Sequence, residues 1–166
     1  TDIFPYLKEN LDDIITVGDE ELVVSFLDMV ENHKMVVENS GLLTVAALKH
    51  LDVKNKKVVA ILSGGNMDVI TMSSVVQQGL VLRDRIFSVS VLLPDKPGEL
   101  SRVADVIAKQ NGNVIKLEHN QFVSINRNAE VELRITMEAF GTEHKNQIIS
   151  SLQQNGYQPK LIRASI

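Results

Sequence analysis

The chain has 166 residues, 44% of them hydrophobic and 23% charged, with a formal net charge of -4 and no cysteine. This much apolar sequence fills the core of one ordinary domain or of two small ones, so we do not expect a disordered chain. The mild negative charge, with lysine and arginine scattered along the chain, argues against nucleic-acid binding. Without cysteine there are no disulfides, no thiolate metal sites and no cysteine nucleophile.

The sequence shows no membrane-targeting pattern. No apolar run approaches the ~20 residues of a spanning helix, and the N-terminus lacks a basic segment followed by an apolar one. We therefore expect a cytoplasmic protein with no membrane partner. The first residue is Thr1 rather than methionine, so we also expect the chain to be a piece of a longer protein.

Short strands and helices alternate in the first half of the chain. The apolar residues 58–62 are typical of a parallel strand that is buried on both faces. Strands are predicted at 11–17 and 58–62, and helices from residue 19 onward, over 42–51 and over 67–78. This order implies right-handed crossover units on a parallel sheet, here an incomplete βαβα segment of an α/β domain. Two or three strands leave the faces and edges of a sheet bare unless more chain or another subunit covers them.

Residues 79–85 break this pattern, and we place a domain boundary there, with one domain at 1–82 and the other at 83–166. In the second domain, apolar and polar residues alternate over 129–138, which is typical of an antiparallel sheet covered on one face only. Glu130 and Glu132 lie on the polar face of that strand, so we expect them to be solvated rather than to act as acid and base.

The element order of the second domain is predicted as strand, helix, strand, strand, helix, strand. The second helix is predicted at 142–154, where it buries Ile148, Ile149 and Leu152 and ends at Asn155-Gly156, and the last strand at 158–164. This is the split, ferredoxin-like α+β arrangement.

The most informative feature of the second domain is the turn at Pro97 and Gly98, which leads from its first strand into its first helix. That helix is predicted to bury residues at the i, i+3, i+4 and i+7 spacing, namely Leu100, Val103, Ala104 and Ile107, and to end at Asn111-Gly112-Asn113. Its first N–H groups have no intrahelical acceptor, so the turn can receive an anion such as a small carboxylate. Taken alone, a Pro-Gly turn is more often a simple connector.

The turn, the helix and the later Gly-Asn-Val-Ile at 112–115, in this element order, resemble the ACT domain, a module that binds small molecules, usually amino acids. The resemblance covers about residues 85–166. It implies that the turn and the helix start receive the ligand, with the start of the second strand across the groove. The effector-binding residues that it implies are Asp95, Lys96, Pro97, Gly98, Glu99, Leu100, Asn113 and Val114. Free N–H groups around Gly98 and Glu99 suit an α-carboxylate, and Asn113 suits the ammonium.

The segment Val-Val-Ala-Ile-Leu-Ser-Gly-Gly-Asn at 58–66, preceded by Val-Val-Glu-Asn-Ser-Gly at 36–41, resembles the end of the catalytic domain of threonine and serine dehydratases. These are pyridoxal phosphate enzymes of fold type II, in which this serine hydrogen-bonds the pyridine nitrogen. The resemblance implies a cofactor-binding segment at Ser63, Gly64, Gly65 and Asn66. Taken alone, two glycines at a strand-to-helix junction more often mark a tight turn. We assign no chemistry to Glu38 or Gly41.

The lysine that binds the cofactor in this family has no counterpart here, and neither has the glycine-rich phosphate loop. Lys54, Lys56 and Lys57 lie in a different sequence context and are interpreted as solvated. Because no lysine can form the Schiff base, we expect the chain alone to be inactive and not to bind pyridoxal 5'-phosphate, and we assign no catalytic residue. The four histidines are dispersed, so no metal site is expected.

Together the two segments resemble the C-terminal portion of the threonine ammonia-lyases that carry one ACT domain. Such enzymes convert L-threonine to 2-oxobutanoate and ammonia, in isoleucine biosynthesis or in threonine catabolism. The resemblance implies an amino-acid effector such as isoleucine or valine, a homo-oligomer formed through ACT domains, and an N-terminal catalytic part as partner. A serine dehydratase of the same family, a non-enzymatic amino-acid sensor and a purely structural scaffold remain as alternatives.

Overall fold

The computed structural model describes residues 2–120 and 130–164, and its contacts divide the chain into two compact units. Unit 1 is Thr1–Val76 and unit 2 is Gln77–Ile166, so the division falls within helix α4 (Val69–Leu82). The boundary predicted from the sequence lies at the end of that helix. In the described part of the chain, no helix combines the length and the hydrophobicity that crossing a bilayer requires.

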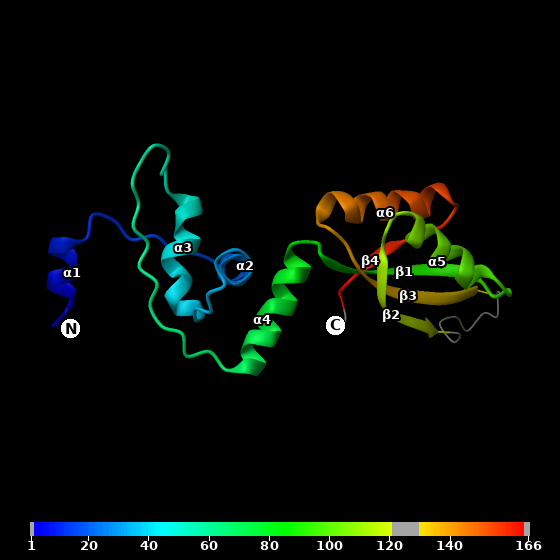
Figure 1. The fold of residues 1–166 in the computed structure, drawn as a ribbon, viewed down its shortest axis with the longest axis horizontal. Helices are drawn as coiled ribbons and strands as arrows, with labels where there is room; N and C mark the ends of the chain where they lie inside the picture. Colours follow the sequence, from blue (N-terminus) through cyan, green and yellow to red (C-terminus); the bar gives the residue numbers. More distant parts are fainter. Residues whose placement is uncertain (1, 121–129, 165–166) are drawn as a thin grey trace. The chain divides into compact units, whose positions relative to one another are not determined.

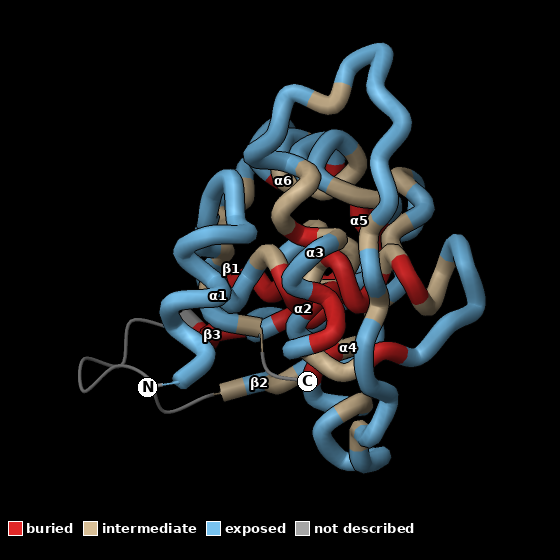
Figure 2. The backbone as a smooth tube through the Cα atoms, turned by 90° about the vertical axis from the view of Figure 1, so that its left-hand side faces the viewer, coloured by how far each residue is buried: buried red, intermediate tan, exposed pale blue. Residues whose placement is uncertain are grey.

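Unit 1 consists of short helices around a small core. In chain order it contains α1 (Phe4–Asn10), α2 (Asp19–Asp28), the π-helical η1 (Met29–His33), the 3-10 turn η2 (Asn39–Leu42), α3 (Leu43–Ala47), the 3-10 turn η3 (Leu48–His50) and the start of α4. The core gathers buried side chains that include Leu22, Phe26, Leu42, Ala46 and Val75. Within unit 1, Figure 2 shows buried residues in and around α2, whereas α1 is exposed throughout.

Helix α2 begins where its acidic residues predict. Asp19, Glu20 and Glu21 occupy the first turn, where the helix dipole favours negative charge. The carboxylate of Glu21 accepts the N–H of Gly18 at 2.8 Å and contacts Nε2 of His50 at 2.8 Å. The bond from Gly18 is the main reason that the pKa of Glu21 is lowered. The predicted helix is confirmed, and its buried face includes Leu22, Val23, Phe26 and Leu27.

Both strands predicted in the first half of the chain are wrong. Residues 11–17 and 58–62 carry no strand, and the parallel sheet does not form among the described residues. Val59 is 89% exposed and Ile61 is 71% exposed, although the apolar run predicted a strand buried on both faces. The physical reason is that a strand needs a hydrogen-bonded neighbour, and the described residues of unit 1 supply none for these segments.

The helix predicted at 67–78 is observed as α4, but it continues through Gly79 to Leu82. A single glycine costs a helix only about 1 kcal/mol relative to alanine, so Gly79 does not end it. The helix stops just before Asp84, where the backbone turns left-handed with a φ of 54°.

Unit 2 is a four-stranded antiparallel sheet with two helices on one face (Figure 1). Its elements are β1 (Ile86–Pro94), α5 (Glu99–Lys109), β2 (Asn113–Asn120), β3 (Glu130–Glu138), α6 (Thr142–Gln154) and β4 (Lys160–Ile162). The strand order is β2-β3-β1-β4, and every neighbouring pair is antiparallel. The predicted βαββαβ order is therefore confirmed; β3 matches its predicted position, Ala129 lies outside the described residues, and β4 is shorter than predicted.

The core of unit 2 lies between the sheet and the helices. Alternate residues of β1 and β3 point into it, as the period of two predicts, and α6 contributes Ile148 and Leu152, each 0% exposed. The apolar stripe predicted for α5 is partly wrong. Leu100 and Ala104 are exposed, and the buried residues of that helix are Val103, Val106 and Ile107. Helix α5 therefore buries a different face from the predicted one, and Leu100 lies at the surface beside the turn that precedes the helix.

The opposite face of the sheet is polar, yet several of its side chains are buried. Ser88 shares a 2.7 Å hydrogen bond with Thr136, and Ser90 Oγ donates to Glu132 at 2.6 Å. Glu132 is only 9% exposed, so the expectation that it is solvated is wrong. A buried carboxylate needs hydrogen-bond donors around it. The alternation of polar and apolar residues along one strand does not show that a neighbouring strand places such donors beside Glu132. Nothing is described of the side chain of Glu130.

Candidate functional site

The turn between β1 and α5 forms an open elbow, which we define as residues 95–98. The N–H of Lys96 donates to the carbonyl of Pro94 at 2.8 Å, and the carbonyl of Gly98 accepts the N–H of Arg102 at 3.1 Å. Gly98 has a φ of 91°, which disfavours residues with a Cβ, and a Cβ placed there would meet no atom within 4 Å. The elbow is therefore both glycine-dependent and open above its glycine.

Backbone donors remain free at the start of α5. Among the described residues, the N–H groups of Leu100 and Ser101 have no backbone acceptor, and that of Glu99 makes only a long bond of 3.4 Å to the carbonyl of Lys96. These groups lie at the positive end of the helix dipole, where an anion is favoured. Asp95, Lys96, Pro97, Gly98 and Leu100 are all exposed there. The structure thus brings these five predicted residues together around N–H groups that have no backbone acceptor.

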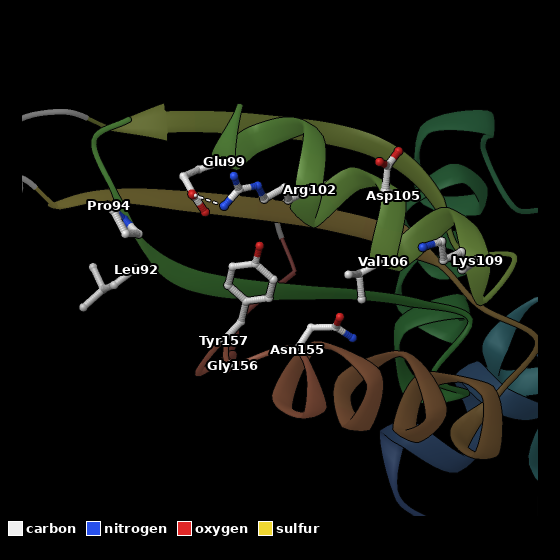
Figure 3. A pocket seen from close by; sticks show the side chains of 10 residues that line it. All are labelled: Leu92, Pro94, Glu99, Arg102, Asp105, Val106, Lys109, Asn155, Gly156 and Tyr157. Carbon is white, nitrogen blue, oxygen red and sulfur yellow. Dashed lines mark hydrogen bonds and ion pairs between the residues drawn. The ribbon is translucent and has the colours of Figure 1, made fainter. Parts of the chain in front are cut away.

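A cavity of about 490 Å³ opens beside the elbow, between α5 and the turn that follows α6 (Figure 3). Of the predicted effector residues, only Glu99 lines it, and its carboxylate accepts a hydrogen bond at 2.8 Å from the Arg102 guanidinium, with which it forms an ion pair. The ring of Tyr157 points its hydroxyl toward this pair (Figure 3). Burial, and then the negative charge of Glu99, raise the pKa of the Tyr157 hydroxyl, so it stays a neutral donor at physiological pH.

Sequence reasoning missed Arg102 and Tyr157 as neighbours of the elbow. The position of Arg102 was readable, because it follows Glu99 by three residues and therefore lies on the same side of α5. Tyr157 was not readable, because it enters from the far end of α6 and only the packing of α6 against α5 brings it to the cavity.

Asn113 and Val114 lie away from the elbow. Helix α5 has 11 residues, which at a rise of 1.5 Å separates its ends by about 16 Å, and Asn113 follows the end opposite Gly98. The amide of Asn113 donates to Glu138 Oε2 at 2.7 Å, and the side chain of Val114 packs against the core. Within one chain, the elbow and Asn113 therefore lie at opposite ends of α5.

The predicted cofactor segment 63–66 lies in unit 1, packed against residues 38–41. The carbonyl of Gly64 accepts the N–H of Glu38 at 3.4 Å. A Cβ on Gly41 would overlap the carbonyl oxygen of Ser63, and a Cβ on Gly64 would overlap the carboxylate of Glu38. Glu38 and Gly41, to which the sequence assigned no role, therefore hold this segment in place.

The residues of this segment do not by themselves fit pyridoxal phosphate. The space that Gly41 and Gly64 leave by lacking a side chain is filled by the chain's own atoms, so it makes no cradle for a phosphate. Ser63 is exposed and has a hydroxyl that suits a ring nitrogen, while Lys54, Lys56 and Lys57 lie in the exposed chain before it. Across the described residues, no three His, Cys, Asp or Glu side chains cluster in a way that could hold a metal ion.

Comparison with known proteins gives relatives for nearly the whole chain, although no family model matches it. The chain is 36% identical over 156 residues to an L-threonine ammonia-lyase of Geobacter sulfurreducens, covering 93% of this chain and 39% of that protein. It is 30% identical over 160 residues to an L-threonine ammonia-lyase of Thermotoga maritima, covering 96% and 40%. The chain thus spans about two fifths of the length of these curated relatives. Among solved structures, prephenate dehydratase from Streptococcus mutans matches 47% of this chain and 41% of its own, at a TM-score of 0.40 and 23% identity.

Proposed function

The chain is a homologue of the L-threonine ammonia-lyases over more than nine tenths of its length, and from this we propose that it is their C-terminal regulatory portion. In this proposal unit 1 is the end of the catalytic domain and unit 2 is an ACT domain. The intact enzyme uses pyridoxal 5'-phosphate to convert L-threonine to 2-oxobutanoate and ammonia, and this chain alone is inactive. The observation that carries the proposal is the coverage: both halves of the chain align with the same relatives.

The exposed apolar surface of unit 1 supports the proposal that a further catalytic part packs against this unit in the intact enzyme. Among its large apolar side chains, Val59 is 89% exposed, Ile70 84% and Ile14 74%. Soluble proteins rarely leave so much apolar surface uncovered without a partner. The segments that were predicted as strands are among the exposed ones, so a neighbouring sheet would both pair them and cover them.

The elbow supports an amino-acid effector, with isoleucine or valine as the proposed ligand. Free N–H groups at the start of α5 suit the α-carboxylate, and Leu100, which is 44% exposed, offers an apolar contact beside them. Asn113 lies too far away in the same chain, so we propose that it comes from a second copy. In the sheet of unit 2, β2 is an edge strand, and its exposed Ile115 and Leu117 suit a contact between copies.

A ligand bound between two copies regulates only through differential affinity. The effector shifts the enzyme toward the state in which the elbow of one copy and Asn113 of the other lie at the correct separation, by as much as it binds that state more tightly. Reciprocally, substrate bound in the catalytic domain alters the affinity for the effector by the same factor.

The effector site is tested by titrating the chain with L-isoleucine and L-valine in a calorimeter. Gly98→Asn keeps a residue that tolerates the left-handed φ but places a side chain over the elbow, and Asn113→Ala removes the amide. Each variant alone is expected to lose the binding at the elbow, so the number of L-isoleucine molecules bound per chain falls. A mixture of the two variants is expected to regain one site per mixed dimer, because one elbow and one Asn113 from different copies are then both intact. An unchanged number of bound L-isoleucine molecules per chain in both variants would falsify this site.

The enzyme assignment is tested separately, with the intact protein and pyridoxal 5'-phosphate. Release of 2-oxobutanoate from L-threonine, faster at equal concentration than release of pyruvate from L-serine, supports a threonine ammonia-lyase. The reverse preference indicates a serine dehydratase. An intact protein with neither activity that still binds the effector indicates a sensor.

A further inference from the structure

A second cavity lies on the face of the unit 2 sheet opposite α5 and α6. It has a volume of about 540 Å³, and residues of β1, β3 and β4 line it, including Ser90, Leu92, Glu132, Lys160 and Ile162. It contains none of the residues that the sequence predicted for effector binding. The cavity is therefore distinct from both the elbow and Asn113.

Strand register places polar and apolar groups of this cavity on one surface. Ser90 pairs with Lys160 on β4, and Leu92 pairs with Glu132 on β3. Directly paired residues project from the same face of a sheet, and so do alternate residues of one strand. Ser90 and Leu92 on β1 therefore lie in line between Lys160 on one side and Glu132 on the other.

One of the side chains that line the cavity is an ionised carboxylate, which is paired with an arginine. Glu132 is 9% exposed and is held by Ser90 Oγ at 2.6 Å and by Arg134 Nε at 3.1 Å. The bond from Ser90, followed by those of Arg134, lowers the pKa of Glu132 despite its burial, so the group is ionised at neutral pH. The side chain of Asn120 is a third donor to this carboxylate. Because a carboxylate has about four lone-pair positions, it can accept one further donor.

The positively charged side chain of Lys160 lies on β4, the strand next to β1. Lys160 is exposed, lines the cavity, and makes no ion pair with any described residue. Leu92, which is 51% exposed, and the half-buried Ile162 supply apolar surface between and beside the two charges. A ligand with only a negative charge would be repelled by the Glu132 carboxylate, and a ligand with only a positive charge would be repelled by Lys160. A molecule that carries both charges satisfies both groups.

We propose that this cavity binds a free amino acid with an aliphatic side chain, at a site separate from the elbow. Glu132 and Ser90 receive its α-ammonium group, Lys160 receives its α-carboxylate, and Leu92 and Ile162 contact its side chain. Pockets of this volume, with a few fixed polar groups and an apolar wall, are typical of small-molecule sites.

The test uses the chain carrying Gly98→Asn, so that the elbow is blocked, titrated with L-isoleucine by calorimetry and by NMR. Adding Lys160→Gln is expected to weaken binding about tenfold, the usual effect of losing one charge-assisted hydrogen bond. Lys116→Gln is the matched control, because Lys116 lies on the same face of the sheet but outside the cavity, and it is expected to leave binding unchanged. Binding is also expected to fall for 3-methylpentanoate, which lacks the ammonium, and for 2-methylbutylamine, which lacks the carboxylate.

The second site is overturned if Lys160→Gln and Lys116→Gln bind L-isoleucine equally well. It is also overturned if the Gly98→Asn chain binds none of L-isoleucine, L-leucine and L-valine at millimolar concentration. In that second case, binding by the unsubstituted chain leaves the elbow site intact. If instead Gly98→Asn has no effect and Lys160→Gln removes all binding, the cavity is the amino-acid site and the elbow proposal fails.

Discussion

Unit 2 closes its own core, whereas unit 1 leaves much of its apolar surface open. In unit 2 all four strands pair with a neighbour, and Val89, Leu133 and Ile148 are 0% exposed. In unit 1 the apolar run 58–62 pairs with no described strand, and its Val59 and Ile61 are exposed. Both sequences have patterns typical of strands. The difference shows that a hydrophobic pattern becomes a strand only when the chain also supplies the hydrogen-bonded neighbour and the covering layer.

The largest effect is expected from truncating matched isoleucines in the two units. Ile148→Ala leaves a cavity in the packed core of unit 2 and is expected to cost about 3 kcal/mol of unfolding free energy. Ile61→Ala, at a residue 71% exposed, is expected to stay within about 0.5 kcal/mol of the unsubstituted chain. Urea unfolding followed by NMR signals of each unit measures both. Equal costs in this chain would show that the run in unit 1 is packed after all.

The fold of unit 2 was predictable because its information is local. The alternation along β3, the spacing of Ile148 and Leu152 in α6, and the Asn155-Gly156 end of that helix each predict an element without reference to the rest of the chain. Gly156 has the left-handed φ of 87° that such an ending requires. The buried face of α5 was less predictable, because Leu100 and Val106 are equally apolar and only the packing of the unit decides which of them is covered.

The next effect concerns the contact between the cofactor segment and residues 38–41. Gly41→Ala places a Cβ against the backbone of Ser63, which cannot move away as a flexible side chain can, and is expected to cost about 2 kcal/mol and to displace the segment. Gly65→Ala is the control, because its Cβ would lie 3.5 Å from the carbonyl of Val36, an ordinary contact. Loss of NMR contacts between 63–66 and 38–41 is the measurement. If both variants keep these contacts, the two segments are not packed as described.

The candidate site was only partly predictable, for a related reason. The elbow residues are consecutive in sequence, so a turn pattern predicts them as a group. Asn113 is separated from Gly98 by the length of helix α5. The sequence gives the number of residues between them, but it does not show that they lie at opposite ends of that helix. The burial of Glu132 is not predictable from its own strand, because its partner Ser90 lies on another strand and the register is set by the whole sheet.

A smaller effect is expected at Asp84, which fastens the chain entering the sheet of unit 2 to the start of α6. Its carboxylate accepts Thr142 Oγ1 at 2.7 Å and Lys145 Nζ at 2.6 Å. Burial alone would raise the pKa of Asp84, but these two donors outweigh it and the pKa is lowered. Asp84→Asn is expected to destabilise unit 2 by about 1 kcal/mol at neutral pH.

The pH dependence of this effect has a definite sign. A carboxylate whose pKa is depressed in the folded state stabilises the fold above its unfolded pKa of about 3.9, and that stabilisation is lost as the pH falls through the folded value. The difference between the Asp84→Asn variant and the unsubstituted chain is therefore expected to shrink below about pH 4. Asp12→Asn, at an exposed position in unit 1, serves as control. A difference that grows on acidification contradicts this account.

The smallest effect is expected at Asp68, where α4 begins in unit 1. Its carboxylate accepts the N–H groups of Ile70 at 3.0 Å and Thr71 at 2.9 Å, which satisfies two of the free donors of the first turn. Ile70 is 84% exposed, so side-chain packing contributes little to holding this turn. Asp68→Ala is therefore expected to raise amide hydrogen exchange in the first turn of α4 several-fold, whereas Asp68→Asn, which keeps an acceptor oxygen, retains most of the protection. Exchange unchanged in both variants would mean that packing holds the start of α4, and that unit 1 is more fully closed than its exposed residues indicate.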